Sequence, residues 1–154
     1  MQNRIAVAMS GGVDSSTAAW LLQQEGHDLV GVMLKMFDGA LVNGSREDGR
    51  PPDGVEDARS VAGKLGIPFY VLDARAPFRS HVLDTFTSAY ERGLTPNPCV
   101  VCNRYVKFGF LLQQALESGR DQVATGHYAR LELDRGSGRW LLKKGLDEGK
   151  DQSY

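Results

Sequence analysis

The stretch that most restricts the fold is AVAMSGGVDSSTAAW, residues 6–20, in which an apolar run breaks at a Ser-Gly-Gly turn and restarts as a helix. Residues 5–9 have the length and composition of a short buried strand, and residues 15–25 place apolar side chains at helical spacing. Glycine allows a tight turn, and one Ser or Asp side chain is enough to cap a helix. Here several hydroxyls, a carboxylate and two glycines gather at one helix start. Because the free N–H groups and the dipole of a helix start attract anions, the stretch predicts a phosphate site.

This predicted phosphate site differs from the common nucleotide-binding loops. It lacks the Gly-Lys-Ser/Thr ending of a Walker A loop and the spaced three-glycine pattern of dinucleotide-binding folds. Kinase-like transfer of the γ-phosphate is therefore disfavoured. A turn with a purely structural role is the alternative.

Strands alternate with helices along the rest of the chain, which predicts an α/β fold with a doubly wound parallel sheet and right-handed crossovers. In such sheets ligands bind at the carboxyl ends of the strands. The turn at Ser10 and the segment ATGHYAR, residues 124–130, both leave strands at that edge, so we expect them to face one nucleotide. The other expected elements are strands at 29–34, 68–72 and 122–125, helices near 55–65, near 77–91 and after the cysteines, a long mobile loop over 38–54, and a hairpin of 128–133 with 139–143.

Composition limits the class of protein. With 154 residues, 42% of them hydrophobic, the chain can bury the core of one domain. It has no apolar run of about 18 residues and no signal-like start, so we expect neither a membrane span nor secretion. Two cysteines are too few for a disulfide framework, which indicates a cytoplasmic setting. The net charge of −1 gives no global sign of nucleic-acid binding, so any RNA surface must be local.

A second motif is TPNPCVVCNRYVKF, residues 95–108, with Cys99 and Cys102 at C-x-x-C spacing before an expected helix. A thiol near a helix start and beside cations, here Arg104 and Lys107, is expected to have a lowered pKa and to form a reactive thiolate. The same cations are expected to bind RNA phosphates. Half of a zinc site is one alternative, although it needs two more ligands and the three histidines are scattered. A thioredoxin-like pair is another, but no strand precedes the motif in the expected way.

Four segments, in order and across the whole chain, together resemble one enzyme family. They are AMSGGVDSS, TPNPCVVCN, ATGHYAR and KKGLDEGKDQSY. Their combination is similar to the tRNA-uridine 2-sulfurtransferases, the MnmA/TrmU type of 2-thiouridylase. The first segment alone also fits GMP synthetase and other enzymes of the ATP-pyrophosphatase class.

The resemblance implies a fold, a reaction and partners. The fold is a Rossmann-like ATP-pyrophosphatase domain, of the adenine nucleotide α-hydrolase type, over residues 1–154. With ATP and Mg²⁺, such enzymes adenylate the C2 oxygen of the wobble uridine in tRNA and release pyrophosphate, and sulfur then replaces the activated oxygen. The implied partners are tRNA and a sulfur donor protein, either a cysteine desulfurase or a sulfur relay.

The resemblance also implies site residues. Cys102 matches the catalytic nucleophile, and Asp14 has an expected role with Mg²⁺ or phosphate. The ATP-binding positions are Ala8, Met9, Ser10, Gly11, Gly12, Val13, Asp14, Ser15, Leu34 and Gly126. The positions that meet the target base are Asn97, Pro98 and Cys99, and those that touch tRNA are His127, Lys150, Asp151 and Gln152.

Two departures from the family pattern bear on mechanism. The family uses a second, persulfide-carrying cysteine in a later segment, and no cysteine follows Cys102 here. We therefore expect the chain to lack the family's central tRNA-binding and C-terminal β-barrel domains, and to be inactive alone in forming 2-thiouridine. Some members have Asp where Cys99 stands, and the C-x-x-C version is similar to tRNA thiolases that hold a [4Fe-4S] cluster with three cysteines. Cluster ligation by Cys99 and Cys102 together with a third cysteine from the missing part is thus a second mechanistic hypothesis.

Other function classes stay open. A GMP-synthetase-like enzyme, which adenylates a small molecule, would keep SGGVDSS but has no use for NPCVVCN. A non-catalytic nucleotide-binding module would bind ATP and form no AMP. Dependence of pyrophosphate release on tRNA separates the three.

Overall fold

A four-stranded parallel sheet forms the centre of the computed structural model, which describes residues 2–38 and 54–153. The strands are β1 (Arg4–Ala8), β2 (Asp28–Lys35), β3 (Phe69–Asp73) and β4 (Gln122–Ala124), in the order β3-β2-β1-β4. The predicted doubly wound α/β fold is confirmed. The loop expected over 38–54 lies almost wholly outside the described residues.

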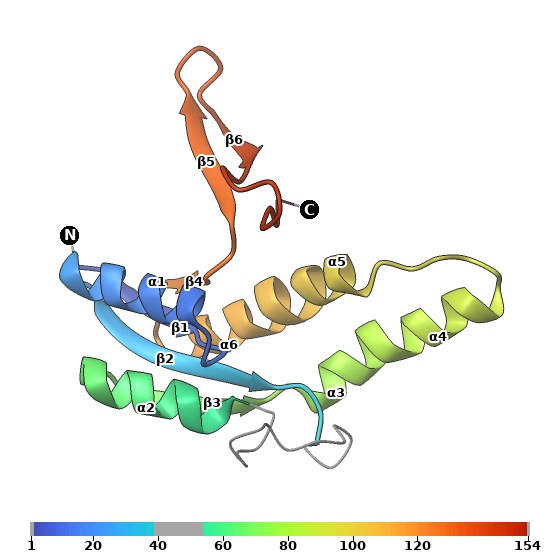
Figure 1. Ribbon diagram of the computed structural model, residues 1–154, viewed down its shortest axis with the longest axis horizontal. Coiled ribbons are helices and arrows are strands. Elements are labelled where there is room, and N and C mark those ends of the chain that lie inside the picture. Colours follow the sequence, from blue (N-terminus) through green and yellow to red (C-terminus); the bar gives the residue numbers. More distant parts are fainter. Residues whose placement is uncertain (1, 39–53, 154) are drawn as a thin grey trace.

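The two faces of the sheet carry different helices because alternate strand residues point to opposite sides. On one face, α1 (Val13–Gln24) and α2 (Val55–Leu65) pack through Ala19, Ala58 and Ala62 against alternate residues of β1 and β2. On the other face, Leu111 and Ala115 of α6 (Leu111–Glu117) cover the intervening residues. Figure 1 shows α1 and α2 running along the sheet.

Two long helical segments extend beyond the carboxyl edge of the sheet (Figure 1). The first joins α3 (Arg75–Phe78), the π-helix η2 (Arg79–Leu83) and α4 (Asp84–Glu91). The second joins α5 (Pro98–Cys102), the π-helix η3 (Asn103–Phe110) and α6. Each therefore contains a stretch wound more widely than an α-helix, which sequence periodicity did not predict.

The helix expected to follow the cysteines in fact contains them, so that prediction is wrong in its starting point. The Asn97 side chain accepts hydrogen bonds from the backbone N–H groups of Cys99 (3.1 Å) and Val100 (3.3 Å). Pro98 occupies the first turn, where its missing N–H costs nothing. An Asn cap followed by Pro starts the helix one residue before Cys99.

The predicted hairpin is confirmed as β5 (Ala129–Asp134) and β6 (Arg139–Lys144), paired antiparallel. The Asp134 carboxylate closes its turn by accepting hydrogen bonds from the backbone N–H groups of Gly136 and Ser137. The hairpin stands away from the sheet in Figure 1. Within residues 2–38 and 54–153, no helix has the length and apolar character needed to cross a membrane.

Candidate functional site

A cavity of about 350 Å³ lies at the carboxyl edge of the sheet, where the strand order reverses. The chain moves from β1 outward through β2 and β3, then returns to the other side of β1 as β4. Loops that leave β1 and β4 therefore diverge, and this is where doubly wound sheets bind ligands. The lining residues come from the ends of β1 and β2, the start of α1, η3 and the loop after β4: Ala8, Met9, Ser10, Asp14, Ser15, Val32, Met33, Leu34, Lys35, Met36, Phe37, Val55, Lys107, Thr125, Gly126, His127 and Gln152.

The turn between β1 and α1 is held by its own side chains. The Ser15 hydroxyl accepts a hydrogen bond from the Ser10 backbone N–H at 3.2 Å, and the Ser16 hydroxyl donates to the Gly12 carbonyl at 2.8 Å. Gly11 has φ +79°, and a Cβ there would lie 2.7 Å from the Gly54 carbonyl oxygen. Part of the polar crowding in this motif thus has a structural role. Ser10 and Asp14 remain exposed at the cavity, beside N–H groups that lack intrahelical partners.

Gly126 lies directly against the start of α1. A Cβ at this position would be 2.7 Å from the Ser15 backbone nitrogen and 2.8 Å from the Asp14 carbonyl carbon. The loop after β4 can approach the helix start this closely only because residue 126 has no side chain. The close approach brings the two motifs SGGVDSS and ATGHYAR to one cavity, as the sequence predicted.

Tyr128, the second residue after Gly126, joins the same helix start to the end of the chain. Its hydroxyl donates a 2.6 Å hydrogen bond to the Asp14 carboxylate. The Lys150 ammonium lies 3.8 Å from the same carboxylate and 4.8 Å from the centre of the Tyr128 ring. The Gln152 backbone N–H donates to the Tyr128 carbonyl at 2.8 Å, so the segment after the hairpin folds back to the cavity.

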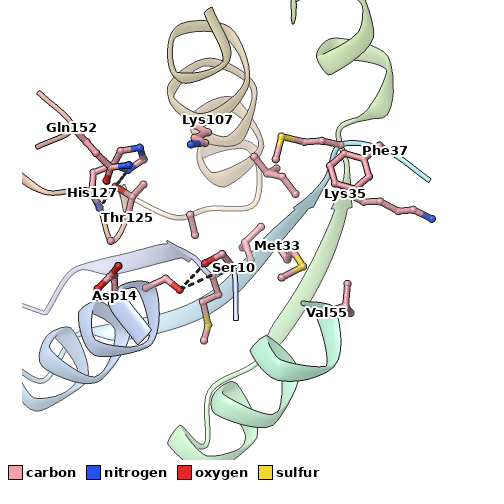
Figure 2. A pocket seen from close by; sticks show the side chains of 17 residues that line it. Ser10, Asp14, Met33, Lys35, Phe37, Val55, Lys107, Thr125, His127 and Gln152 are labelled. Carbon is pink, nitrogen blue, oxygen red and sulfur yellow. Dashed lines mark hydrogen bonds between the residues drawn. The ribbon is translucent and has the colours of Figure 1, made fainter. Parts of the chain in front are cut away.

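His127 is half-buried between the cavity and η3. Its Nδ1 lies 2.6 Å from the Thr125 hydroxyl oxygen (Figure 2). Its ring centre is 5.4 Å from that of Phe108. Burial, and then the nearby charge of Lys107, lower the pKa of His127. The imidazole is therefore mainly neutral at pH 7.

Comparison with known proteins decides the family. The sequence model described as the tRNA methyl transferase HUP domain matches residues 3–154. The chain belongs to this family. The resemblance inferred from the four sequence segments is thus confirmed at the level of the family and its fold.

Relatives of this HUP domain carry a more specific name. The chain is 47% identical over 154 residues to the tRNA-specific 2-thiouridylase MnmA of Clostridioides difficile (strain 630), covering 100% of this chain and 43% of the relative. It is 50% identical over 157 residues to the MnmA of Moorella thermoacetica, covering 96% of this chain and 42% of the relative. The chain therefore spans less than half the length of these relatives.

Solved structures share the fold of the HUP domain. The U34-tRNA thiolase NcsA from Methanococcus maripaludis, with its [4Fe-4S] cluster, matches with a TM-score of 0.54 and 25% identity, over 82% of this chain and 39% of that one. A predicted subunit of tRNA methyltransferase from Methanocaldococcus jannaschii matches with a TM-score of 0.52 and 18% identity, over 80% of this chain and 52% of that one. The second likeness concerns the fold alone.

The cavity of this HUP domain brings together many of the positions named from the sequence and leaves others outside. Lining it are Ala8, Met9, Ser10, Asp14, Ser15, Leu34, Gly126, His127 and Gln152. Gly11, Gly12 and Val13 shape the turn without lining the cavity, and Asn97, Pro98, Cys99, Cys102, Lys150 and Asp151 lie outside it. The Asp151 carboxylate accepts a 2.7 Å hydrogen bond from the Gly145 backbone N–H, which stabilises the segment after the hairpin.

Sequence reasoning missed several cavity residues. It assigned Lys107 to the thiol and to RNA, and it did not name the end of β2 beyond Leu34 or the residue Thr125. Lys107 follows Cys102 by five residues, and this spacing was the available signal for it. In an α-helix, however, residues five apart point to different sides, so the spacing did not predict that Lys107 lines the cavity. The additional lining residues are Val32, Met33, Lys35, Met36, Phe37, Val55, Lys107 and Thr125.

The expected low pKa of the Cys102 thiol is wrong. Cys102 is buried with Val82 and Val106, and its Sγ lies 4.0 Å from the Met36 Sδ. Burial raises the pKa of Cys102, and the charge of Lys107 offsets this only in part. Arg104 instead lies over the Tyr105 ring, 5.2 Å from its centre. Cys99 is the exposed thiol of the pair.

The donor atoms present fit a phosphate-bound Mg²⁺ better than a metal held by protein alone. Among the described residues, no three His, Cys, Asp or Glu side chains are grouped to hold a metal ion. Asp14 is the only acidic residue that the described part of the chain places on the cavity wall. This suits Mg²⁺, which commonly takes one or two carboxylates together with substrate phosphates. The zinc half-site gains no further ligands within residues 2–38 and 54–153.

The residues of this chain do not complete a [4Fe-4S] cluster by themselves. Such a cluster needs three or four thiolates, and the chain has two cysteines. One of them, Cys102, is buried against Met36 in an apolar cluster.

Proposed function

We propose that residues 1–154 are the ATP-pyrophosphatase domain of a tRNA 2-thiouridylase. The observation that carries the proposal is the cavity at the strand-order reversal, which ends against the same helix that bears the C-x-x-C motif. A nucleotide site and a sulfur site are thereby adjacent. The names of the relatives support the same reaction, and their greater length leaves room for the further tRNA-binding and β-barrel domains that the resemblance implies.

In this proposal ATP binds with its phosphates at the start of α1 and its adenosine between Leu34 and Gly126. The helix dipole and free N–H groups stabilise the phosphate charge. Asp14 would hold Mg²⁺, which supplies charge neutralisation on the departing pyrophosphate. The C2 oxygen of the wobble uridine bonds to the α-phosphate, and pyrophosphate leaves with the electron pair of the broken bond.

The second step replaces the adenylated oxygen by sulfur. Asn97, Pro98 and Cys99 are proposed to meet the target base, and Cys102 to act as the nucleophile. Its thiol must ionise against the effect of burial, so the charge of Lys107 matters for its reactivity. The sulfur is proposed to come from a donor protein, a cysteine desulfurase or a sulfur relay, and AMP leaves with the former C2 oxygen. His127, Lys150 and Gln152 are proposed to contact tRNA beside the cavity.

Pyrophosphate release tests this function against its alternatives. We expect the chain with Mg²⁺ and ATP to release pyrophosphate only when a tRNA with uridine at the wobble position is added, and not with the same tRNA carrying adenosine there. Release with a small acceptor such as xanthosine monophosphate, independent of tRNA, would instead support a GMP-synthetase-like enzyme. ATP binding measured by calorimetry without AMP formation from any acceptor would leave a nucleotide-binding module.

A further inference from the structure

The helix that follows Cys99 presents two cations on different sides. Arg104 is exposed and lies over the Tyr105 ring, which itself stacks on His81 with ring centres 4.8 Å apart. Lys107 is half-buried and lines the cavity, and Figure 2 shows it on the cavity side of its helix, across from Ser10. These positions indicate that the two cations serve different ligands.

The π-helical winding of η3 brings Lys107 to the side of Cys102. In an α-helix, residues five apart are turned from each other by about 140°. In a π-helix the hydrogen bonds join residues five apart, so such residues lie on the same side of the helix. Lys107 follows Cys102 by five residues, and η3 begins directly after Cys102. The charge of Lys107 accordingly acts on both Cys102 and His127.

Lys107 has no anionic partner in the described part of the chain. Lys35, which lines the same cavity, lies 3.5 Å from the Asp38 carboxylate, and Lys150 lies 3.8 Å from Asp14. No described carboxylate comes within 4.0 Å of the Lys107 ammonium. A half-buried ammonium that faces the same cavity as a helix N-terminus, and that has no anionic partner among the described residues, is suited to an anionic ligand.

We propose that Lys107 is a catalytic residue that binds the α-phosphate of the nucleotide, and that it does not bind the tRNA backbone. This assignment rests on the proposed function. The α-phosphate is the group that must lie between the nucleotide cavity and the thiol, because it is the group attacked first and then joined to the target oxygen.

The ammonium stabilises negative charge in both steps. In the first, the bond from the uridine oxygen to phosphorus forms, the bond to pyrophosphate breaks with its electron pair on pyrophosphate, and the uridine N3 proton passes to solvent. In the second, the outer sulfur of the donor protein's persulfide bonds to C2, and the C2–oxygen bond breaks with its electron pair on AMP. The Cys102 thiolate then bonds to the inner sulfur, the S–S bond breaks with its electron pair on the sulfur at C2, and N3 regains a proton, so a disulfide of Cys102 with the donor cysteine is the other product. Lys107 keeps its proton throughout, so it acts by charge.

Binding of AMP and adenosine to variants of the chain tests the assignment. Lys107→Met keeps the length of the side chain and removes its charge. We expect it to weaken AMP binding about tenfold, as the loss of one charge-assisted contact does, and to leave adenosine binding unchanged. Lys107→Arg should restore much of the AMP affinity. Circular dichroism and the unfolding midpoint verify that each variant is folded.

Arg104→Met is the matched control on the same helix. It should leave AMP affinity unchanged and reduce the salt dependence of tRNA binding by about one released counterion, whereas Lys107→Met should leave that slope as in the wild type. The reverse pattern, or equal weakening of AMP and adenosine, would overturn the assignment of Lys107 while leaving the proposed function intact. Failure of the wild-type chain to bind either AMP or ATP would overturn both.

Discussion

The Tyr128 hydroxyl donates a 2.6 Å hydrogen bond to the Asp14 carboxylate, which joins the loop after β4 to the first turn of α1. Lys150 lies beside both groups, 3.8 Å from the carboxylate. The proposed Mg²⁺ and phosphate residue is thereby connected to a segment proposed to contact tRNA. A ligand that binds Lys150 or Tyr128 would therefore change the contacts of the Asp14 carboxylate.

Tyr128→Phe should weaken binding of Mg²⁺ and ATP with little loss of stability. The variant removes the bond that orients Asp14 and keeps the ring beneath Lys150. Because these groups are exposed, we expect the free energy of unfolding to fall by about 1 kcal/mol or less, and the affinity for Mg²⁺ and ATP to fall about fivefold. Urea unfolding and calorimetry measure the two quantities.

Tyr90→Phe on α4 is the control for that prediction. It makes the same chemical change at an exposed tyrosine far from the cavity. Equal effects of the two variants on nucleotide affinity would contradict a positioning role for Tyr128.

The sheet and its helices were predictable because their signals are local. The apolar runs of β1 and β2, the glycines that end α1 and α2, and the turn of the hairpin each determine an element within a few residues. The π-helical segments were not predictable in this way. Their wider winding depends on packing between η2, η3 and the apolar cluster around Val82 and Val106, which involves residues distant in sequence.

Gly126→Ala should destabilise the fold and disturb the cavity together. The added Cβ would lie 2.7 Å from the backbone nitrogen of Ser15, so either α1 or the loop after β4 must move. Overpacking of this kind costs about 1–3 kcal/mol, and here the displaced atoms belong to the proposed phosphate site. Urea unfolding and ATP titration should therefore both show a loss.

Gly63→Ala provides the matched control for this steric argument. Gly63 lies within α2, and a Cβ there would meet no atom within 4 Å. Alanine in an open helical position should increase stability by about 0.5–1 kcal/mol and leave ATP affinity unchanged. If both glycine variants behaved alike, close packing of the two motifs would not explain the requirement at position 126.

The candidate site was predictable where one motif forms it and unpredictable where several elements meet. The segment Ala8 to Ser15 and Gly126 were named from sequence, and most of these residues line the cavity. The environment of Cys102 was misjudged because its burial depends on Met36 and Val82, which lie outside the motif of residues 95–108, as well as on Val106. The spacing predicted that the Cys102 thiol lies near cations. It did not predict that burial raises the pKa of this thiol by more than the nearby charge lowers it.

Alkylation of Cys102 should therefore require a higher pH than that of an ordinary thiol. In a Cys99→Ser background, the rate of iodoacetamide modification plotted against pH should have its midpoint above about 8.5, because burial disfavours the thiolate. Adding Lys107→Met should move the midpoint higher still, since the Lys107 charge partly offsets burial. A midpoint at or below that of a free small thiol would show that Cys102 is solvated in solution.

His127 should make the stability of the fold depend on pH in the mildly acidic range. Burial, with Lys107 as the nearby charge, lowers the pKa of His127, so the unfolded chain binds its proton more readily than the folded chain. The contribution to stability is fully present above the unfolded pKa of about 6.5, and it is lost as the pH falls through the lower pKa of the folded chain.

His127→Asn retains a polar group that can reach the Thr125 hydroxyl and removes the titration. The free energy of unfolding, measured in urea at about pH 7.5 and about pH 5, should fall less steeply for this variant than for the wild type. Because both proteins share every other titrating group, identical slopes would mean that His127 is protonated as easily in the folded chain as in the unfolded one.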